Sequence, residues 1–71
     1  MREEIMCRGS VKVGKKAIAF TATCPYDSYN RGGILKFSHG RSKVRLKIDI
    51  YQAQDPHTCS RIVENYCNSS T

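Results

Sequence analysis

Residues 43–51 constrain the fold most, because charged or polar residues alternate with aliphatic residues through the whole segment. In an extended strand, successive side chains point to opposite faces of the sheet. One face of this strand would be entirely aliphatic, and it consists of Val44, Leu46, Ile48 and Ile50. The opposite face would carry Lys43, Arg45, Lys47, Asp49 and Tyr51. The pattern therefore predicts a central strand with one buried face and one largely basic face.

Shorter alternating patterns predict three strands ahead of this segment, at residues 5–13, 17–24 and 34–38. In the first of them Cys7 shares the apolar parity with Ile5, and Gly9 is expected to form a bulge or bend. Gly14 begins a turn to the second strand, and residues 25–33 are rich in turn-forming residues. A tight hairpin around Gly40 then leads into the central strand. These elements predict antiparallel pairing between neighbours.

The last segment supports two interpretations. Its apolar residues recur at helical spacing, which predicts an amphipathic helix over residues 58–67; they are Cys59, Ile62, Val63, Tyr66 and Cys67. As a strand, the same segment would still place both cysteines on one face. Residues 52–57 are expected to form a loop, and residues 68–71 a disordered tail.

A chain of 71 residues makes one domain, 1–71, that buries little apolar surface unless it is cross-linked. Its four cysteines predict two disulfides and an oxidising compartment. Four cysteines permit three pairings, and the spacing leaves all three open. None of the spacings matches a structural zinc site, so we expect neither a metal nor another cofactor.

The net charge of +6 predicts an acidic partner, such as nucleic acid, anionic lipid or an acidic protein surface. We expect no membrane span, because no run of 18 apolar residues occurs. The residues expected to contact the partner are Arg41, Lys43, Arg45, Lys47, Tyr51, Lys15 and Lys16, with Lys12 and Lys36 beside them. The alternative is a solvated face that is kept charged to prevent edge-to-edge aggregation.

Catalysis is not expected. The two histidines, His39 and His57, fall in a hairpin and a loop, and Asp55 is the only acid near either in sequence. Tyrosines beside the basic residues could stack on bases, although packing is the more common role of such side chains. The tyrosines concerned are Tyr26, Tyr29, Tyr51 and Tyr66.

The order of these elements resembles the MAX effectors, which are small secreted proteins of plant-pathogenic fungi. Cys7 lies in the first strand, Cys24 closes the second, a Gly-Gly pair opens the third, and Cys59 follows the long alternating strand. The resemblance implies an all-β, six-stranded antiparallel β-sandwich. It also implies disulfides that join Cys7 to Cys59 and Cys24 to Cys67. The alternative fold is α+β with a C-terminal helix.

The function implied by this resemblance is non-catalytic virulence or modulation of plant immunity. A secreted monomer would bind a host plant protein, such as an immune-receptor domain, and the host cytoplasm is a further expected location. The chain begins without a signal-peptide pattern, so a secreted protein would be represented here by its mature form. A small basic nucleic-acid-binding β-module is the alternative. A cationic antimicrobial or chemokine-like protein is a third hypothesis.

Overall fold

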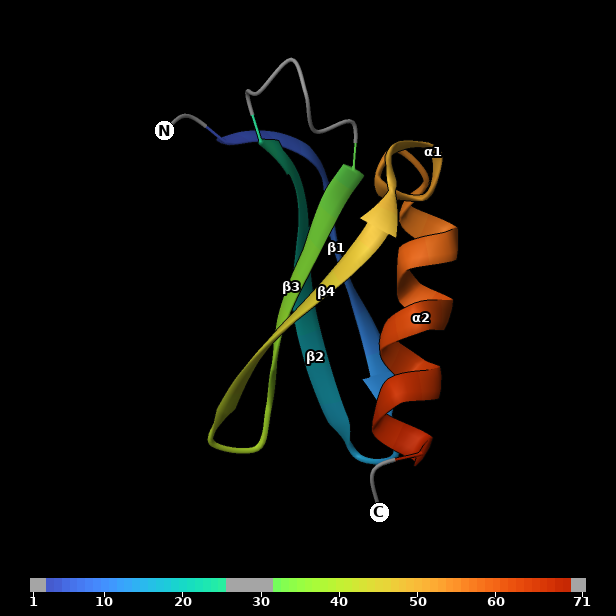
Figure 1. Cartoon of the computed structure of the whole chain (residues 1–71). Helices are drawn as coiled ribbons and strands as arrows, with labels where there is room; N and C mark the ends of the chain where they lie inside the picture. The colour runs from blue at the N-terminus through green and yellow to red at the C-terminus, as the bar shows by residue number, and fades with distance from the viewer. Residues whose placement is uncertain (1–2, 26–31, 70–71) are drawn as a thin grey trace.

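The computed structural model describes residues 3–25 and 32–69 as an antiparallel sheet with helices on one of its faces (Figure 1). The elements in chain order are β1 (Glu3–Val13), β2 (Lys16–Pro25), β3 (Gly32–His39), β4 (Ser42–Asp49), α1 (Ile50–Ala53) and α2 (Pro56–Ser69). The strands pair in the order β1-β2-β3-β4, so each hairpin places sequence neighbours side by side. The expected loop residues Tyr26 and Tyr29 lie outside the described residues.

The described residues form four strands and a C-terminal helix, so the six-stranded sandwich is wrong. The α+β alternative predicted the C-terminal helix. Helical spacing places Cys59, Val63 and Cys67 on one buried stripe, whereas Arg61 and Glu64 are exposed. A strand would have mixed these two sets. The helix continues through Ser69, and therefore includes two of the residues that were expected in a disordered tail.

The central strand ends two residues earlier than its alternation predicts. Ile50 and Tyr51 belong to α1, and the backbone N–H of Asp49 donates a hydrogen bond to Oε1 of Gln52 at 3.0 Å. A side chain that reaches back to the residue before a helix stabilises the first helical turn. The helix therefore begins where the alternating pattern would have continued the strand.

The bulge in β1 lies at Met6 rather than at Gly9. The pairing with β2 changes register between Ile5 and Cys7, so these two residues lie on opposite faces of the sheet although their positions share a parity. Gly9 instead makes room for an aromatic ring. A Cβ atom at this position would lie 2.7 Å from Cζ of Phe20.

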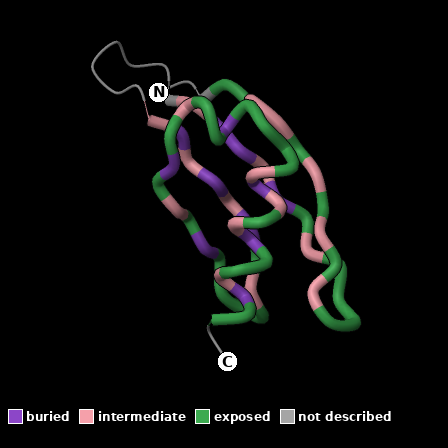
Figure 2. Tube along the Cα trace, turned by 90° about the vertical axis from the view of Figure 1, so that its right-hand side faces the viewer, coloured by how far each residue is buried: buried purple, intermediate pink, exposed green. Residues whose placement is uncertain are grey.

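The hydrophobic core lies between the sheet and the helices (Figure 2). We call this side of the sheet the covered face. Its best-buried side chain is Leu35 in β3, and Val63 of α2 is equally inaccessible to solvent. The rings of Phe37 and Tyr66 meet edge to face, with centroids 5.4 Å apart. The other buried apolar residues are Phe20, Ala22, Val44, Ile48, Ala53, Cys59 and Cys67.

The sheet is not paired along its full length. β2 pairs with β3 only from Phe20 to Thr23, whereas β3 pairs with β4 over its whole length. The β3–β4 hairpin therefore extends beyond the four-stranded part and diverges from the β1–β2 hairpin (Figure 1). Both hairpin turns contain a glycine with φ of 64°, Gly14 and Gly40. Glycine adopts this left-handed conformation without the steric penalty of a side chain.

Candidate functional site

The sheet surface opposite α2 is the candidate site, and we call it the open face. Its side chains alternate along each strand with those of the covered face. No helix or strand among residues 3–25 and 32–69 packs across it (Figure 1). The strand residues on it are Ile5, Arg8, Ser10, Lys12, Ala17, Ala19, Thr21, Thr23, Gly32, Ile34, Lys36, Ser38, Lys43, Arg45, Lys47 and Asp49.

Basic side chains form a row across the strands of the open face as well as a row along β4. The register places Arg8 opposite Thr21, Thr21 opposite Lys36, and Lys36 opposite Arg45. Directly opposed residues of antiparallel strands have Cβ atoms about 5 Å apart. Along β4, alternate residues are separated by about 7 Å. The two directions together make a two-dimensional array of positive charge, which a single strand pattern could not reveal.

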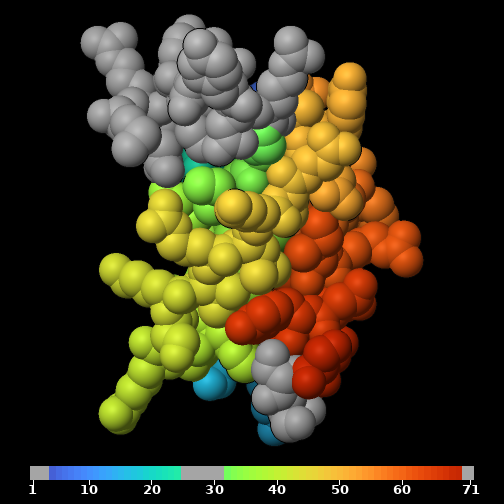
Figure 3. All heavy atoms as spheres, viewed as in Figure 1, coloured from blue at the N-terminus to red at the C-terminus, as the bar shows by residue number. Residues whose placement is uncertain are grey.

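Small side chains leave room between these cations. Ala19 of β2 and Ser38 of β3 lie just beyond the last β2–β3 pair, and both are exposed. A shallow hollow of about 300 Å³ lies here, with Lys36, Lys43 and Arg45 around it. Long side chains project from the β3–β4 region in the space-filling view (Figure 3). Ala19, Phe37, Ser38 and Val44 complete its lining, so three of its seven lining residues are basic.

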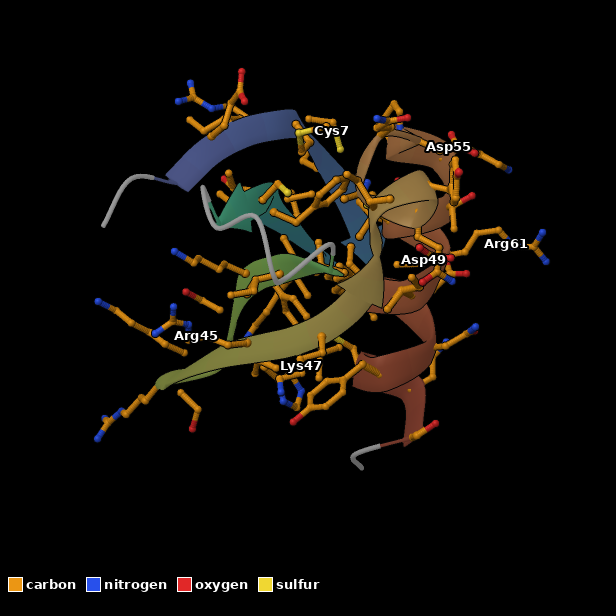
Figure 4. All side chains as sticks on the ribbon, turned by 45° about the horizontal axis from the view of Figure 1, so that its top comes forward. Cys7, Arg45, Lys47, Asp49, Asp55 and Arg61 are labelled. Atoms are coloured by element: carbon orange, nitrogen blue, oxygen red, sulfur yellow. The ribbon has the colours of Figure 1, made fainter. Side chains whose placement is uncertain are left out.

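The described acidic side chains lie away from the centre of this array. Glu4 is near the start of β1, Asp49 and Asp55 flank α1, and Glu64 is on α2. Arg45 points away from the helices, whereas Asp55 and Arg61 lie on the helical side of the molecule (Figure 4). The charge is therefore segregated, and the open face is its positive pole.

The other residues expected to contact a partner have different positions. Arg41 is exposed in the β3–β4 turn, and Lys15 and Lys16 are exposed at the β1–β2 turn, so all three lie at one end of the sheet. Tyr51 is 76% exposed, but it belongs to α1 at the opposite end of β4. The fold thus separates Tyr51 from Lys43 by the length of the strand.

The histidines are not brought together. His39 packs edge to face on Tyr66, with ring centroids 5.9 Å apart, whereas His57 lies in the first turn of α2. Asp55 precedes that turn and accepts hydrogen bonds from Thr58 Oγ1 at 2.7 Å and from the His57 backbone N–H at 3.1 Å. The Thr58 hydrogen bond is the main reason that the pKa of Asp55 is lowered from its ordinary value of 3.8. This arrangement caps a helix.

Two of the four cysteines are close neighbours. The Sγ atoms of Cys7 and Cys59 are 3.9 Å apart, and none of the four cysteines forms a disulfide in the structure. The Cys59 thiol also donates to the backbone oxygen of Gln52 at 3.1 Å. Burial, followed by the hydrogen bond with Cys7, raises the pKa of Cys59 to about 12. The described residues contain no cluster of three or more histidine, cysteine or acidic side chains that could hold a metal.

The implied bond between Cys24 and Cys67 is not present. Cys24 lies beside the backbone oxygen of Gly32, at 3.7 Å, near the end of β2. Cys67 lines a cavity with Ile18, near the start of the same strand. Six residues of extended strand span about 20 Å, whereas the Cα atoms of a disulfide lie about 6 Å apart. This pair would need a rearranged sheet, whereas the Cys7–Cys59 pair would not.

Comparison with protein-family models, curated proteins and solved structures gives no match to this chain. The resemblance to MAX effectors is therefore unsupported by any relative. Within the described residues, no helix is both long enough and apolar enough to cross a membrane.

Sequence reasoning also missed Arg8 as a member of the site. The sequence shows that Arg8 and Cys7 point to opposite faces of their strand. The position of Arg8 in a row with Lys36 depends on the pairing of three strands.

Proposed function

We propose that the protein is a non-catalytic nucleic-acid-binding module that contacts phosphates through the open face. The observation that carries the proposal is the segregation of charge. The open face holds Arg8, Lys12, Lys36, Lys43, Arg45 and Lys47. Of the described acidic side chains, Asp49 shares this face at the end of β4, whereas Glu4, Asp55 and Glu64 do not. A surface of this kind attracts polyanions and releases their counterions on binding.

The shape of the surface also supports contacts with a phosphate backbone. The centre of the face is lined by Ala17, Ala19 and Thr21, whose short side chains let a ligand approach the sheet. The longer lysine and arginine side chains on the flanking strands can then reach phosphate oxygens. Such contacts position a protein on nucleic acid and supply affinity without requiring a specific sequence.

Docking to a host protein is the second candidate function, and the position of β4 favours it. β4 is an edge strand, so one row of its backbone N–H and C=O groups faces away from β3. An extended segment of a partner can pair with such an edge. The secreted effector role implied by the family resemblance belongs with this candidate. Main-chain pairing depends little on salt, which separates it from phosphate binding.

A matched pair of charge reversals tests the leading proposal. Arg45→Glu changes the open face, whereas Arg61→Glu makes the same chemical change on the helical side (Figure 4). Binding of fluorescent DNA and RNA oligonucleotides would be followed by anisotropy in 50 mM and 200 mM salt. If about four phosphates are contacted, the wild type should lose about 100-fold in affinity between these two salt concentrations.

We expect Arg45→Glu to weaken binding about tenfold and Arg61→Glu to change it by about twofold or less. Thermal melting of both variants checks that the fold is intact. Equal effects of the two variants would contradict a site on the open face. Absence of binding to every oligonucleotide, with retention of a protein ligand at high salt, would favour the second candidate.

A further inference from the structure

The end of the β3–β4 hairpin forms a two-stranded ribbon, which we define as residues 38–43. The pairing of β2 with β3 ends at Phe20 and Phe37, but Ser38 still pairs with Lys43 and His39 with Ser42. A cavity of about 580 Å³ lies where the hairpins diverge, and its lining includes residues from both β2 and the ribbon. The ribbon therefore continues past the last β2–β3 pair, at the same end of the molecule as the β1–β2 turn (Figure 1).

Among the described residues, α2 packs against the ribbon on its covered face. Tyr66 of α2 contacts the ring of His39 at 5.9 Å between centroids and the ring of Phe37 at 5.4 Å. The ribbon thus rests on α2 through its covered face. Its other surface carries Ser38 and Lys43, both exposed, and Arg41 is exposed at the turn. An anchored ribbon keeps these polar groups in a fixed position before a ligand binds.

The length and width of the ribbon match the major groove of B-form DNA. Gly40 in the turn lies three residues past Phe37, the last residue of β3 that pairs with β2, so at about 3.4 Å per residue this part of the hairpin is about 10 Å long. The major groove of B-form DNA is about 8.5 Å deep and about 12 Å wide, and it admits a two-stranded ribbon. The minor groove, about 6 Å wide, is too narrow for the ribbon. The major groove of duplex RNA is also narrow.

The chemistry of the surface favours a duplex over a single strand. Proteins that hold single strands commonly stack the bases on aromatic rings. None of the described residues of the open face is aromatic, and Phe37 and Tyr66 lie on the covered side. By contrast, arginine and lysine at a ribbon tip can donate to guanine O6 and N7 in the major groove, and a serine hydroxyl can contact any base edge. Ribbon residues Arg41, Ser42 and Lys43 have these groups.

We infer that the ribbon enters the major groove of duplex DNA while Lys36 and Arg45 contact the flanking phosphates. This inference rests on the proposed nucleic-acid-binding function and names its ligand. Lys36 and Arg45 lie opposite one another just before the ribbon begins, so they would face the backbone at the rim of the groove. Ribbon residues Arg41 and Lys43 would face the base edges.

The ligand is tested with four fluorescent oligonucleotides at one salt concentration. They are duplex DNA, duplex RNA of the same sequence, single-stranded DNA, and duplex DNA whose pyrimidines carry a bulky C5 substituent, which fills the major groove. We expect the unmodified DNA duplex to bind about tenfold more tightly than each of the others. Equal binding to the blocked duplex, to duplex RNA or to the single strand would overturn the inference and leave the proposed function standing.

Two substitutions in the same strand locate the contact. Lys43→Glu lies in the ribbon, whereas Lys47→Glu lies on the same face at the four-stranded end of β4. We expect Lys43→Glu to weaken binding to duplex DNA about tenfold and Lys47→Glu to weaken it about threefold. A larger effect of Lys47→Glu would overturn the inference. If neither substitution weakens binding to duplex DNA, or if none of the four oligonucleotides binds, the proposed function is overturned as well.

Discussion

The two faces of the sheet are built from the same strands but differ in almost every physical property. Along β4, Val44 and Ile48 on the covered face are each 9% exposed, whereas Lys43, Arg45 and Lys47 on the open face are exposed (Figure 2). The covered face gains its free energy from removing apolar surface from water. The open face keeps charges in water, where they are well solvated.

This difference separates the residues that maintain the fold from those available for binding. Because side chains of a strand alternate between faces, a substitution at one position alters one face and leaves the other largely unchanged. Stability should therefore depend mainly on the covered face, and affinity mainly on the open face. Substitutions on each face can therefore test this separation.

The largest change should follow truncation in the covered face. Leu35 is fully buried at the centre of β3, so Leu35→Ala should lower the free energy of unfolding by about 3 to 4 kcal/mol. Lys43→Ala, on the exposed side of the sheet, should change it by about 0.5 kcal/mol or less. Urea unfolding of both variants provides the measurement. A similar loss in both would mean that the faces have been assigned the wrong way round.

Cross-linking the covered face should give the next largest effect. Oxidised glutathione should join Cys7 to Cys59, because their Sγ atoms are already 3.9 Å apart, and each disulfide formed converts one oxidised glutathione to two reduced thiols. A disulfide that closes a loop of this length typically stabilises a protein by about 2 to 4 kcal/mol. The high pKa of Cys59, about 12, keeps its thiol protonated at neutral pH and should make the reaction slow.

A non-reducing peptide map with intact mass identifies the bond. Cys59→Ser, which lacks one partner, is the control and should show no stabilisation under the same oxidising conditions. A bond between Cys59 and Cys67 instead would contradict the observed packing, because both are on α2 and Cys7 is the nearer partner.

A smaller effect should come from Thr23, a well-buried polar side chain of the open face. Thr23 is 4% exposed, and its Oγ1 atom has no hydrogen-bond partner among the residues that the structure describes. Thr23→Val removes this hydroxyl with little change of shape and should stabilise the protein by about 1 kcal/mol. Thr21→Val, on the same strand and face but only half-buried, should be nearly neutral. If thermal melting shows that Thr23→Val destabilises the protein, the claim that the Thr23 hydroxyl lacks a hydrogen bond is wrong.

The smallest effect concerns pH and the start of α2. The pKa of Asp55 is lowered mainly by the Thr58 hydrogen bond, so its ionised form is favoured in the folded state. Its contribution to stability is therefore present above the ordinary pKa of 3.8 and is lost as the pH falls through the lower folded-state value. Asp55→Asn should reduce the fall in melting temperature below this pH. An unchanged pH profile would contradict the capping role.

Much of the fold could be predicted from the sequence, since alternation identified the strands and helical spacing favoured α2. The bulge at Met6 could not be predicted, because it depends on the register between β1 and β2. The end of β4 could not be read from hydrophobicity, because the alternation continues into α1, where Gln52 caps the first turn. The basic residues of β4 were recognised, but the row from Arg8 to Arg45 exists only after the strands have paired.

Alanine methyl groups report on the two faces most directly. Ala17 and Ala19 are exposed on the open face, whereas Ala22 and Ala53 are fully buried on the covered side. The protein, labelled with ¹³C in its alanine methyls, would be titrated with duplex DNA and followed by NMR. We expect the resonances of Ala17 and Ala19 to shift and those of Ala22 and Ala53 to stay nearly unchanged. Shifts confined to the buried pair, or no shifts at all, would contradict binding through the open face.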